Sequence, residues 1–170
     1  MRSLALLPLL FLCACSDGGG GAPKAKSEPA AALQPGQWEV TSEVTRFTQN
    51  DKGAPKINTP AGTKATHSVC VDAADAKKPK PELFAGTDAE CKYNDFYMSR
   101  GSVNAQLACT RPGLSGDVMM TAAGDFEAAT FNTTLDTSTS LSTEGDVTIA
   151  SKLTGRRTGE CTAAPADAKG

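Results

Sequence analysis

The chain has 170 residues, a formal net charge of −2 at pH 7, and only 5% aromatic residues. It lacks the excess of basic residues that marks a nucleic-acid-binding protein, so we exclude nucleic acid as a partner. The length suits one domain, and an abundance of small and β-branched residues favours many short strands over a large helical core.

The first residues have the layout of an export signal. Residues 1–14 contain one arginine followed by an apolar run, which is typical of a signal peptide and is shorter than the ~20 residues of a membrane-spanning helix. The stretch Leu12-Cys13-Ala14-Cys15 resembles the lipobox of bacterial lipoproteins, in which Cys15 would carry the lipid. We expect a membrane anchor at Cys15. The alternative is a plain cleaved signal peptide with two incidental cysteines.

The residues after this cysteine have the composition of a linker. Residues 15–34 are rich in Gly, Ala, Pro and charge and contain few apolar side chains, which predicts a flexible tether. The anchor and tether predict a location in the bacterial cell envelope, facing the periplasm. Ser16, rather than Asp, after the lipidated cysteine favours the outer membrane. We expect a β domain over residues 35–161 and a disordered tail over residues 162–170.

The segments beyond the tether alternate between apolar and polar residues. Residues 37–47 place Trp38, Val40 and Val44 on one face, which predicts a half-buried strand. A loop rich in Gly and Pro separates this strand from a second one over residues 63–71.

A short helix is expected next, over the start of residues 72–86. Asp72 is a suitable N-cap. Pro79 and Pro81 are expected to end the helix, because proline lacks the amide N–H that a helix interior needs.

Residues 90–110 give the clearest predicted hairpin. With Arg100-Gly101 at the turn, the apolar residues of both strands share one face. The resulting pairs are Met98 with Val103, Phe96 with Ala105, and Asn94 with Leu107.

A second hairpin is predicted over residues 115–135, with Gly124-Asp125 at its turn. Its pairs would be Val118 with Phe131 and Met120 with Ala129. The polar residues 136–145 predict a further turn with irregular strand ends. A last strand over residues 146–157 turns Val147, Ile149 and Leu153 inward.

These elements together predict a mainly β single domain. We expect a strongly curved antiparallel β-meander of about seven strands, open or barrel-like, with one short helix. The four cysteines of the domain are Cys70, Cys91, Cys109 and Cys161. Export to an oxidising compartment predicts two disulfides, and the absence of a C-x-x-C pair argues against a metal site.

The pairing of these cysteines is open, because four cysteines allow three connectivities. In the predicted register Cys91 and Cys109 fall on opposite faces, so a direct bond would need a slip or a bulge. Cys109 shares the inward face of its strand, and Cys161 shares the parity of the inward residues in the last strand. We favour Cys109–Cys161 with Cys70–Cys91. The alternative is Cys91–Cys109 with Cys70–Cys161.

Several stretches in this order resemble a known bacterial family. They are LQPGQWEVTSEVT, SVCVDAADAKKPKPELF, ECKYNDFYMSRGSV, LACT and GRRTGEC, and they span about Leu33 to Cys161. The resemblance is to the domain of unknown function 3617, whose members are exported or lipid-anchored. It implies a fold and a location, and it carries no established activity or catalytic residues.

Few residues suggest catalysis. His67 is the one histidine of the chain, and we interpret it as a packed or partly exposed side chain. Asp88 and Glu90 are expected to be solvated, while Arg156 and Arg157 point to opposite faces and predict structural pairing. We therefore expect no enzyme activity, no catalytic residues and no cofactor.

Two functions are left open by the sequence. The first is a binding or structural module of the envelope that contacts an envelope protein or an apolar ligand. The second is a carrier of a lipid-like ligand, which would require a roomy apolar cavity, whereas a filled interior favours the first. A hydrolase would require His67 beside an acidic residue and a hydroxyl in a cleft.

Overall fold

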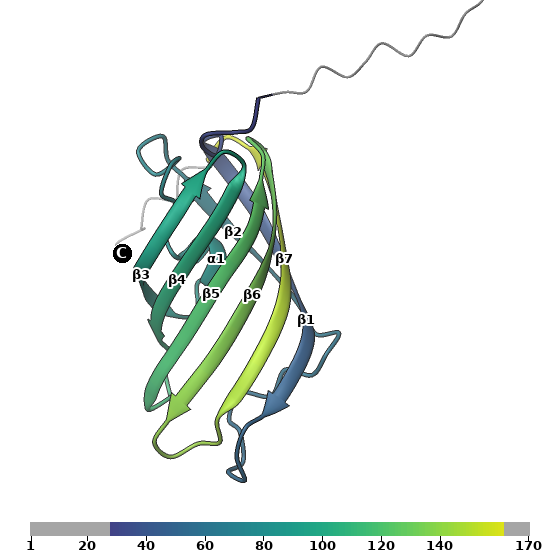
Figure 1. The fold of residues 1–170 in the computed structure, drawn as a ribbon, viewed down its shortest axis with the longest axis vertical. Helices are drawn as coiled ribbons and strands as arrows, with labels where there is room; N and C mark the ends of the chain where they lie inside the picture. The colour runs from purple at the N-terminus through teal and green to yellow at the C-terminus, as the bar shows by residue number, and fades with distance from the viewer. Residues whose placement is uncertain (1–27, 162–170) are drawn as a thin grey trace, which may run out of the picture.

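The computed structural model describes residues 28–161, which form a single curled sheet shaped like a half-barrel (Figure 1). The elements are β1 (Gly36–Gln49), β2 (Lys64–Val71), α1 (Glu82–Ala85), β3 (Glu90–Ser99), β4 (Ser102–Thr110), β5 (Gly116–Phe126), β6 (Thr130–Leu141) and β7 (Val147–Gly159). Within this range no helix is both long and apolar enough to cross a membrane. The predictions for residues 1–14, Cys15 and residues 162–170 lie outside the described residues.

The strands follow the order β2-β1-β7-β6-β5-β4-β3, and each neighbouring pair is antiparallel. The first and last long strands, β1 and β7, are therefore neighbours, while β2 and β3 are the two edges. The segment between those edges carries α1 on the concave side of the sheet (Figure 1). The predicted fold class, a curved antiparallel meander of seven strands with one short helix and two disulfides, is confirmed.

One end of the concave face is filled by aromatic side chains, which we call the aromatic cluster: Trp38, Phe84 and Phe131. The rings of Trp38 and Phe131 are stacked with centroids 6.0 Å apart, and Phe84 lies 5.7 Å from Phe131. Trp38 is fully buried, and its indole N–H donates to the carbonyl of Gln34 at 3.1 Å. At Gly155 a Cβ would collide with the Phe131 ring, so the glycine makes room for the cluster.

The predicted register of the first hairpin is correct near its turn. Arg100 and Gly101 form a two-residue turn with positive φ angles of 51° and 79°, as the favoured hairpin turns require. Met98 pairs with Val103 and Phe96 with Ala105, as expected. Further from the turn, a bulge intervenes between Tyr93 and Asp95, so that Leu107 faces Tyr93 instead of Asn94.

That bulge corrects the predicted disulfides. It adds one residue to β3 and brings Cys91 directly opposite Cys109, where the two are bonded with a Cα–Cα distance of 4.1 Å. The other bond joins Cys70 to Cys161, with Cα atoms 5.5 Å apart. The favoured pairing, Cys109–Cys161 with Cys70–Cys91, is therefore wrong, and the alternative is observed. The parity argument for Cys161 failed because β7 ends at Gly159.

The second hairpin turns later than expected. β5 continues to Phe126, which pairs with Phe131, while Met120 pairs with Thr137 rather than Ala129, and Val118 with Thr139 rather than Phe131. Gly124 lies within the strand, where a Cβ would collide with the Asn132 carbonyl. The glycine thus permits a close approach of two strands and does not mark the turn.

The short helix also lies elsewhere than expected. The residues after Asp72 form turns, and α1 begins only after Pro81. Proline is well tolerated at the first turn of a helix because its missing N–H has no intrahelical partner there. The prolines precede the helix instead of ending it.

The end of the predicted tether packs against the domain. Leu33 is only 3% exposed, and its N–H donates to the Ala76 carbonyl at 2.9 Å. The Ala30 carbonyl accepts from the Gly101 N–H at 2.9 Å. For residues 28–34 the tether prediction is wrong, because Leu33 offers an apolar side chain to bury. The rest of the tether lies outside the described residues.

Candidate functional site

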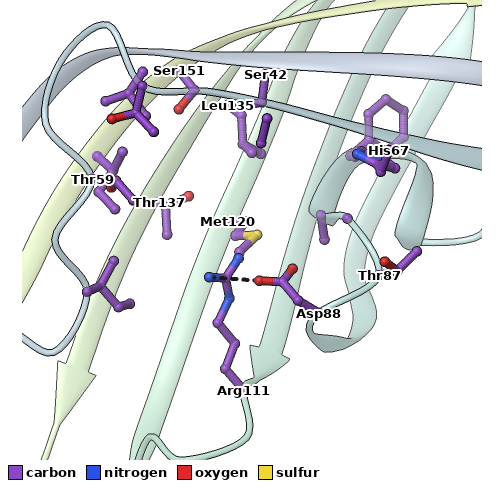
Figure 2. A pocket seen from close by; sticks show the side chains of 18 of the residues that line it. Ser42, Thr59, His67, Thr87, Asp88, Arg111, Met120, Leu135, Thr137 and Ser151 are labelled. Carbon is purple, nitrogen blue, oxygen red and sulfur yellow. Dashed lines mark ion pairs between the residues drawn. The ribbon is translucent and has the colours of Figure 1, made fainter.

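The half-barrel holds a cavity of about 360 Å³ between its concave face, the loop that follows β1, and the segment around α1 (Figure 2). Phe84 borders this cavity and also packs on Phe131. It therefore separates the cavity from the rest of the aromatic cluster.

Two transverse rows of inward side chains form the floor of the cavity. One row joins Met120, Thr137 and Ile149 across β5, β6 and β7, and the next joins Leu135, Ser151 and Val44 across β6, β7 and β1. All six residues are buried. The floor is therefore mainly apolar but contains two hydroxyl groups.

The loop that follows β1 forms one wall. Ile57 packs against the buried cluster of Val44, Val147 and Ile149. Lys56 donates to the Gly113 carbonyl at 2.5 Å and lies 3.5 Å from a carboxylate oxygen of Glu144. These contacts hold the wall against the turns at the far end of the sheet.

Glu144 is the acidic partner in that attachment. The hydrogen bond from the Thr143 side chain, followed by the charge of Lys56, lowers the pKa of the Glu144 carboxyl below its ordinary value of 4.5. The carboxylate is therefore the preferred form of Glu144 in the folded protein.

The opposite wall is the segment around α1, which is tied to both edge strands. His67 of β2 donates its Nε2–H to the carbonyl of Glu82 at 3.0 Å, since a carbonyl oxygen can only accept. Tyr93 of β3 donates its hydroxyl to the Pro79 carbonyl at 2.8 Å. Burial, with a smaller effect of the Glu82 carboxylate, raises the pKa of Tyr93. His67 and Tyr93 thus hold the segment around α1 across the gap between the two edge strands.

Arg111 reaches into the mouth of the cavity from the loop that follows β4 (Figure 2). Its Nη1 lies 3.3 Å from Oδ2 of Asp88, and the two side chains are 27% and 67% exposed. Within residues 28–161 its Nε is buried and has no hydrogen-bond partner. A pair with one so exposed member contributes about 0–1 kcal/mol.

The other charged residues singled out from the sequence lie away from the cavity. Arg156 binds Glu39 on the neighbouring strand, with nitrogen and oxygen 2.7 Å apart, and Arg157 donates to the carbonyl of Pro35 at 2.6 Å and pairs with Glu160. Glu90 is exposed at the start of β3.

The sequence indicated some parts of this site and missed others. His67 was singled out and borders the cavity, and Asp88, expected to be solvated, is largely exposed but pairs with Arg111. Thr137 and Ser151 were missed, although each shares the parity of an apolar inward neighbour on its strand. Arg111 was missed because it follows the strand directly, where alternation no longer applies.

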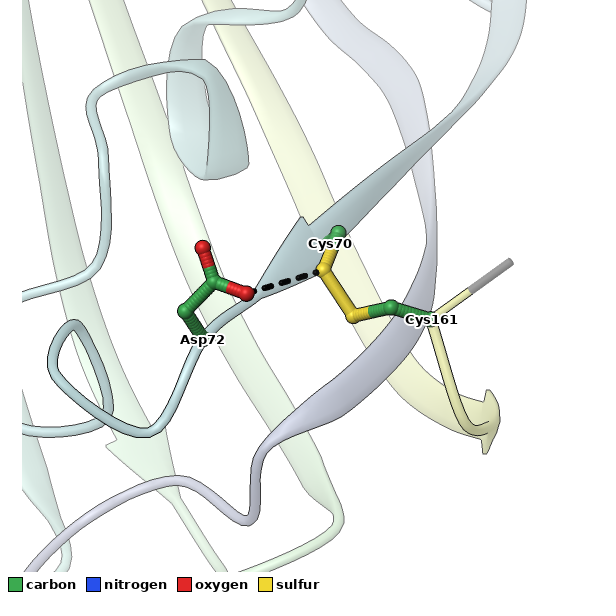
Figure 3. A group of neighbouring side chains, drawn as sticks. All are labelled: Cys70, Asp72 and Cys161. Carbon is green, nitrogen blue, oxygen red and sulfur yellow. Dashed lines mark hydrogen bonds between the residues drawn. A yellow bond between two sulfur atoms is a disulfide. The ribbon is translucent and has the colours of Figure 1, made fainter. Parts of the chain in front are cut away.

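One group of potential metal ligands occurs among the described residues: Cys70, Asp72 and Cys161 (Figure 3). The two sulfur atoms are bonded to each other, whereas metal binding requires thiolates. The Asp72 carboxylate lies 3.5 Å from the Cys70 sulfur. In its oxidised form this group is therefore a disulfide beside a carboxylate, without free sulfur ligands.

Comparison with known protein families gives a match. A family model described as "Protein of unknown function (DUF3617)" matches residues 33–161. The match begins at the buried Leu33 and ends at the disulfide-bonded Cys161. No curated protein and no solved structure matches the chain.

Proposed function

The chain belongs to the DUF3617 family of proteins of unknown function, and from this premise we propose that it is a non-catalytic binding module of the bacterial cell envelope. In this proposal the ligand is a small amphiphile that occupies the half-barrel cavity. The observation that carries the proposal is a mainly apolar floor that contains two hydroxyl groups, with one ion pair at the mouth of the cavity.

The size of the cavity favours a small ligand. Its volume of about 360 Å³ is near the lower end of the ~300–1,000 Å³ typical of small-molecule pockets. The aromatic cluster fills the neighbouring space, so a multi-chain lipid would have little room. A carrier role is therefore limited to ligands with one short chain.

The contacts of the titratable groups favour binding over catalysis. His67 uses Nε2 to hold the Glu82 carbonyl, and Asp88 pairs with Arg111. Within residues 28–161 no hydrogen bond links the histidine to a carboxylate or a hydroxyl. The histidine therefore holds the backbone of α1 in place. Among the described residues it has no hydrogen bond to a hydroxyl group that it could activate as a nucleophile.

The envelope location rests on the lipobox-like sequence that ends at Cys15. Several acyl chains on one cysteine give stable membrane attachment, whereas a single chain gives only marginal binding. Cys15→Ser should move the protein from the membrane fraction to the soluble fraction. The membrane attachment is refuted if the variant stays with the membrane to the same extent as the wild type.

Binding in the cavity can be tested by adding the neutral fluorophore N-phenyl-1-naphthylamine to the full chain. Thr137→Phe should fill the floor and abolish the fluorescence increase that the wild type gives. Ser138→Phe is the matched control, because residue 138 is exposed on the outer face of the same strand. Equal binding by both variants, or none by the wild type, would contradict the proposal.

A further inference from the structure

We propose that the ligand carries a single negative charge, a carboxylate on an aliphatic chain, and that Arg111 binds this group at the mouth of the cavity. The inference rests on the proposed function, because it names the chemistry of the ligand in the same cavity. It comes from the charges and unused hydrogen-bond donors around the mouth.

Arg111 is the one permanently charged base among the described residues that border the cavity, and Asp88 is the one carboxylate. Among residues 28–161 the guanidinium forms one ion pair, from Nη1 to Asp88. A guanidinium has five N–H donors in a planar fork that matches a carboxylate. In this inference the Nη donors that do not contact Asp88 bind the ligand.

The position of Arg111 suits an amphiphile. Figure 2 shows its guanidinium directed from the loop toward the cavity floor, close to the Met120 side chain in this view. A carboxylate bound there would lie at the mouth, and its aliphatic chain would continue over Leu135 and Ile149. The charged group would stay in contact with solvent while the aliphatic chain is buried. This arrangement is favourable because burying an unpaired charge is costly.

The neighbouring Asp88 sets the charge of the ligand. A phosphate monoester would bring two negative charges next to Arg111 and the carboxylate of Asp88. A ligand carboxylate would bring only one negative charge to this ion pair. Like charges close together destabilise the charged form of both groups. Asp88 is 67% exposed, so it can turn toward solvent when a ligand carboxylate takes its place.

The bonded cysteines keep this pair in position. Asp88 lies three residues before Cys91, and Arg111 lies two residues after Cys109. The Cys91–Cys109 bond therefore limits how far the two elements that carry Asp88 and Arg111 can separate.

The test measures displacement of N-phenyl-1-naphthylamine by decanoate, methyl decanoate and decyl phosphate at pH 7. In the wild type, decanoate should displace the probe about tenfold better than methyl decanoate, as a charge-assisted hydrogen bond implies. Decyl phosphate should be weaker than decanoate. Arg111→Gln should remove the preference for the acid, whereas Arg156→Gln, on the outer face beside Glu39, should keep it.

A second variant keeps the inference testable if Arg111→Gln does not fold. Asp88→Asn removes the competing carboxylate and should strengthen decanoate binding several-fold, with a smaller gain for the ester. If decanoate and its ester compete equally in the wild type, or if decyl phosphate binds best, the inference is overturned while the binding module stands. If the wild type binds neither probe nor competitors, the proposed function itself fails.

Discussion

The two ends of the concave face differ in side-chain size and not in backbone pattern. Around the aromatic cluster, inward positions carry large rings, and Trp38 is fully buried. Further along the same strands, inward positions carry residues such as Thr137 and Ser151, which are buried yet leave a cavity of about 360 Å³. One alternating pattern thus builds a packed core at one end and a hollow at the other.

One disulfide lies in each of these two regions. Removal of the first one should cause the largest loss of unfolding free energy. Cys70–Cys161 lies near the aromatic cluster, since Cys70 pairs with Gln37, and it closes a separation of 91 residues. Replacing both cysteines with alanine should lower the free energy of unfolding by ~4–5 kcal/mol in the chain-entropy model. Urea denaturation measures this loss, and decanoate binding by the folded fraction should remain.

Loss of the other disulfide should act on the hollow end. Cys91–Cys109 has a separation of 18 residues, for which the same model gives ~3 kcal/mol. Because this bond flanks Asp88 and Arg111, the double alanine variant should also bind decanoate more weakly. If both double variants weaken decanoate binding equally, the division of the two bonds between the regions is incorrect.

The second prediction compares one large side chain from each region. Trp38→Ala removes a fully packed ring and should cost ~3–5 kcal/mol of unfolding free energy. Met120→Ala should cost less, near the low end of ~2–5 kcal/mol, because one side of Met120 faces the cavity and has fewer contacts to lose. Urea denaturation of both variants decides this, and Trp38→Phe is the control for ring packing. An equal or larger loss for Met120→Ala would mean that the hollow end is packed as tightly as the other.

The sequence predicted the packed end better than the hollow end. Large apolar residues such as Trp38 and Val40 alternate strictly, so their inward face was evident. On β6 the inward positions beyond Leu135 are occupied by Thr137 and Thr139, and the polar stretch that contains them suggested a turn. A threonine methyl group packs well on a strand. Because threonine is counted as a polar residue, a count of apolar residues does not identify it as inward-facing.

Other features depended on events that a regular pattern does not contain. The bulge near Asn94 reversed the parity of Cys91 and so decided the disulfides. Arg111 entered the candidate site from a loop, and its partner Asp88 comes from another loop beyond α1. Such contacts form only when the sheet curls into a half-barrel. The periodicity of a single strand cannot predict them.

The third prediction separates two buried threonines on the same strand. Thr139 accepts a hydrogen bond from the Val147 N–H at 2.9 Å and donates to Asp146 at 3.1 Å. Thr139→Val should therefore cost ~1–3 kcal/mol, since the Val147 N–H would be left buried without an acceptor. Thr137→Val, at the cavity floor, should change the unfolding free energy by less than ~1 kcal/mol and strengthen binding of the neutral probe. A large loss for Thr137→Val would contradict the view that this hydroxyl serves the cavity and not the fold.

The smallest predicted effect is the pH dependence of the cavity wall. Since the folded pKa of Glu144 is below its ordinary value of 4.5, its contribution to stability is present above pH 4.5 and is lost as the pH falls through the lowered folded pKa. The wild type should therefore lose more unfolding free energy than Glu144→Gln between pH 5 and pH 3. Glu43→Gln is the control, because Glu43 forms an exposed pair with Lys64 on the outer face. Thermal unfolding at several pH values measures the difference. Equal acid sensitivity of the wild type and Glu144→Gln would show that the Lys56–Glu144 contact does not secure the wall, and the loop after β1 would then be held mainly by the packing of Ile57.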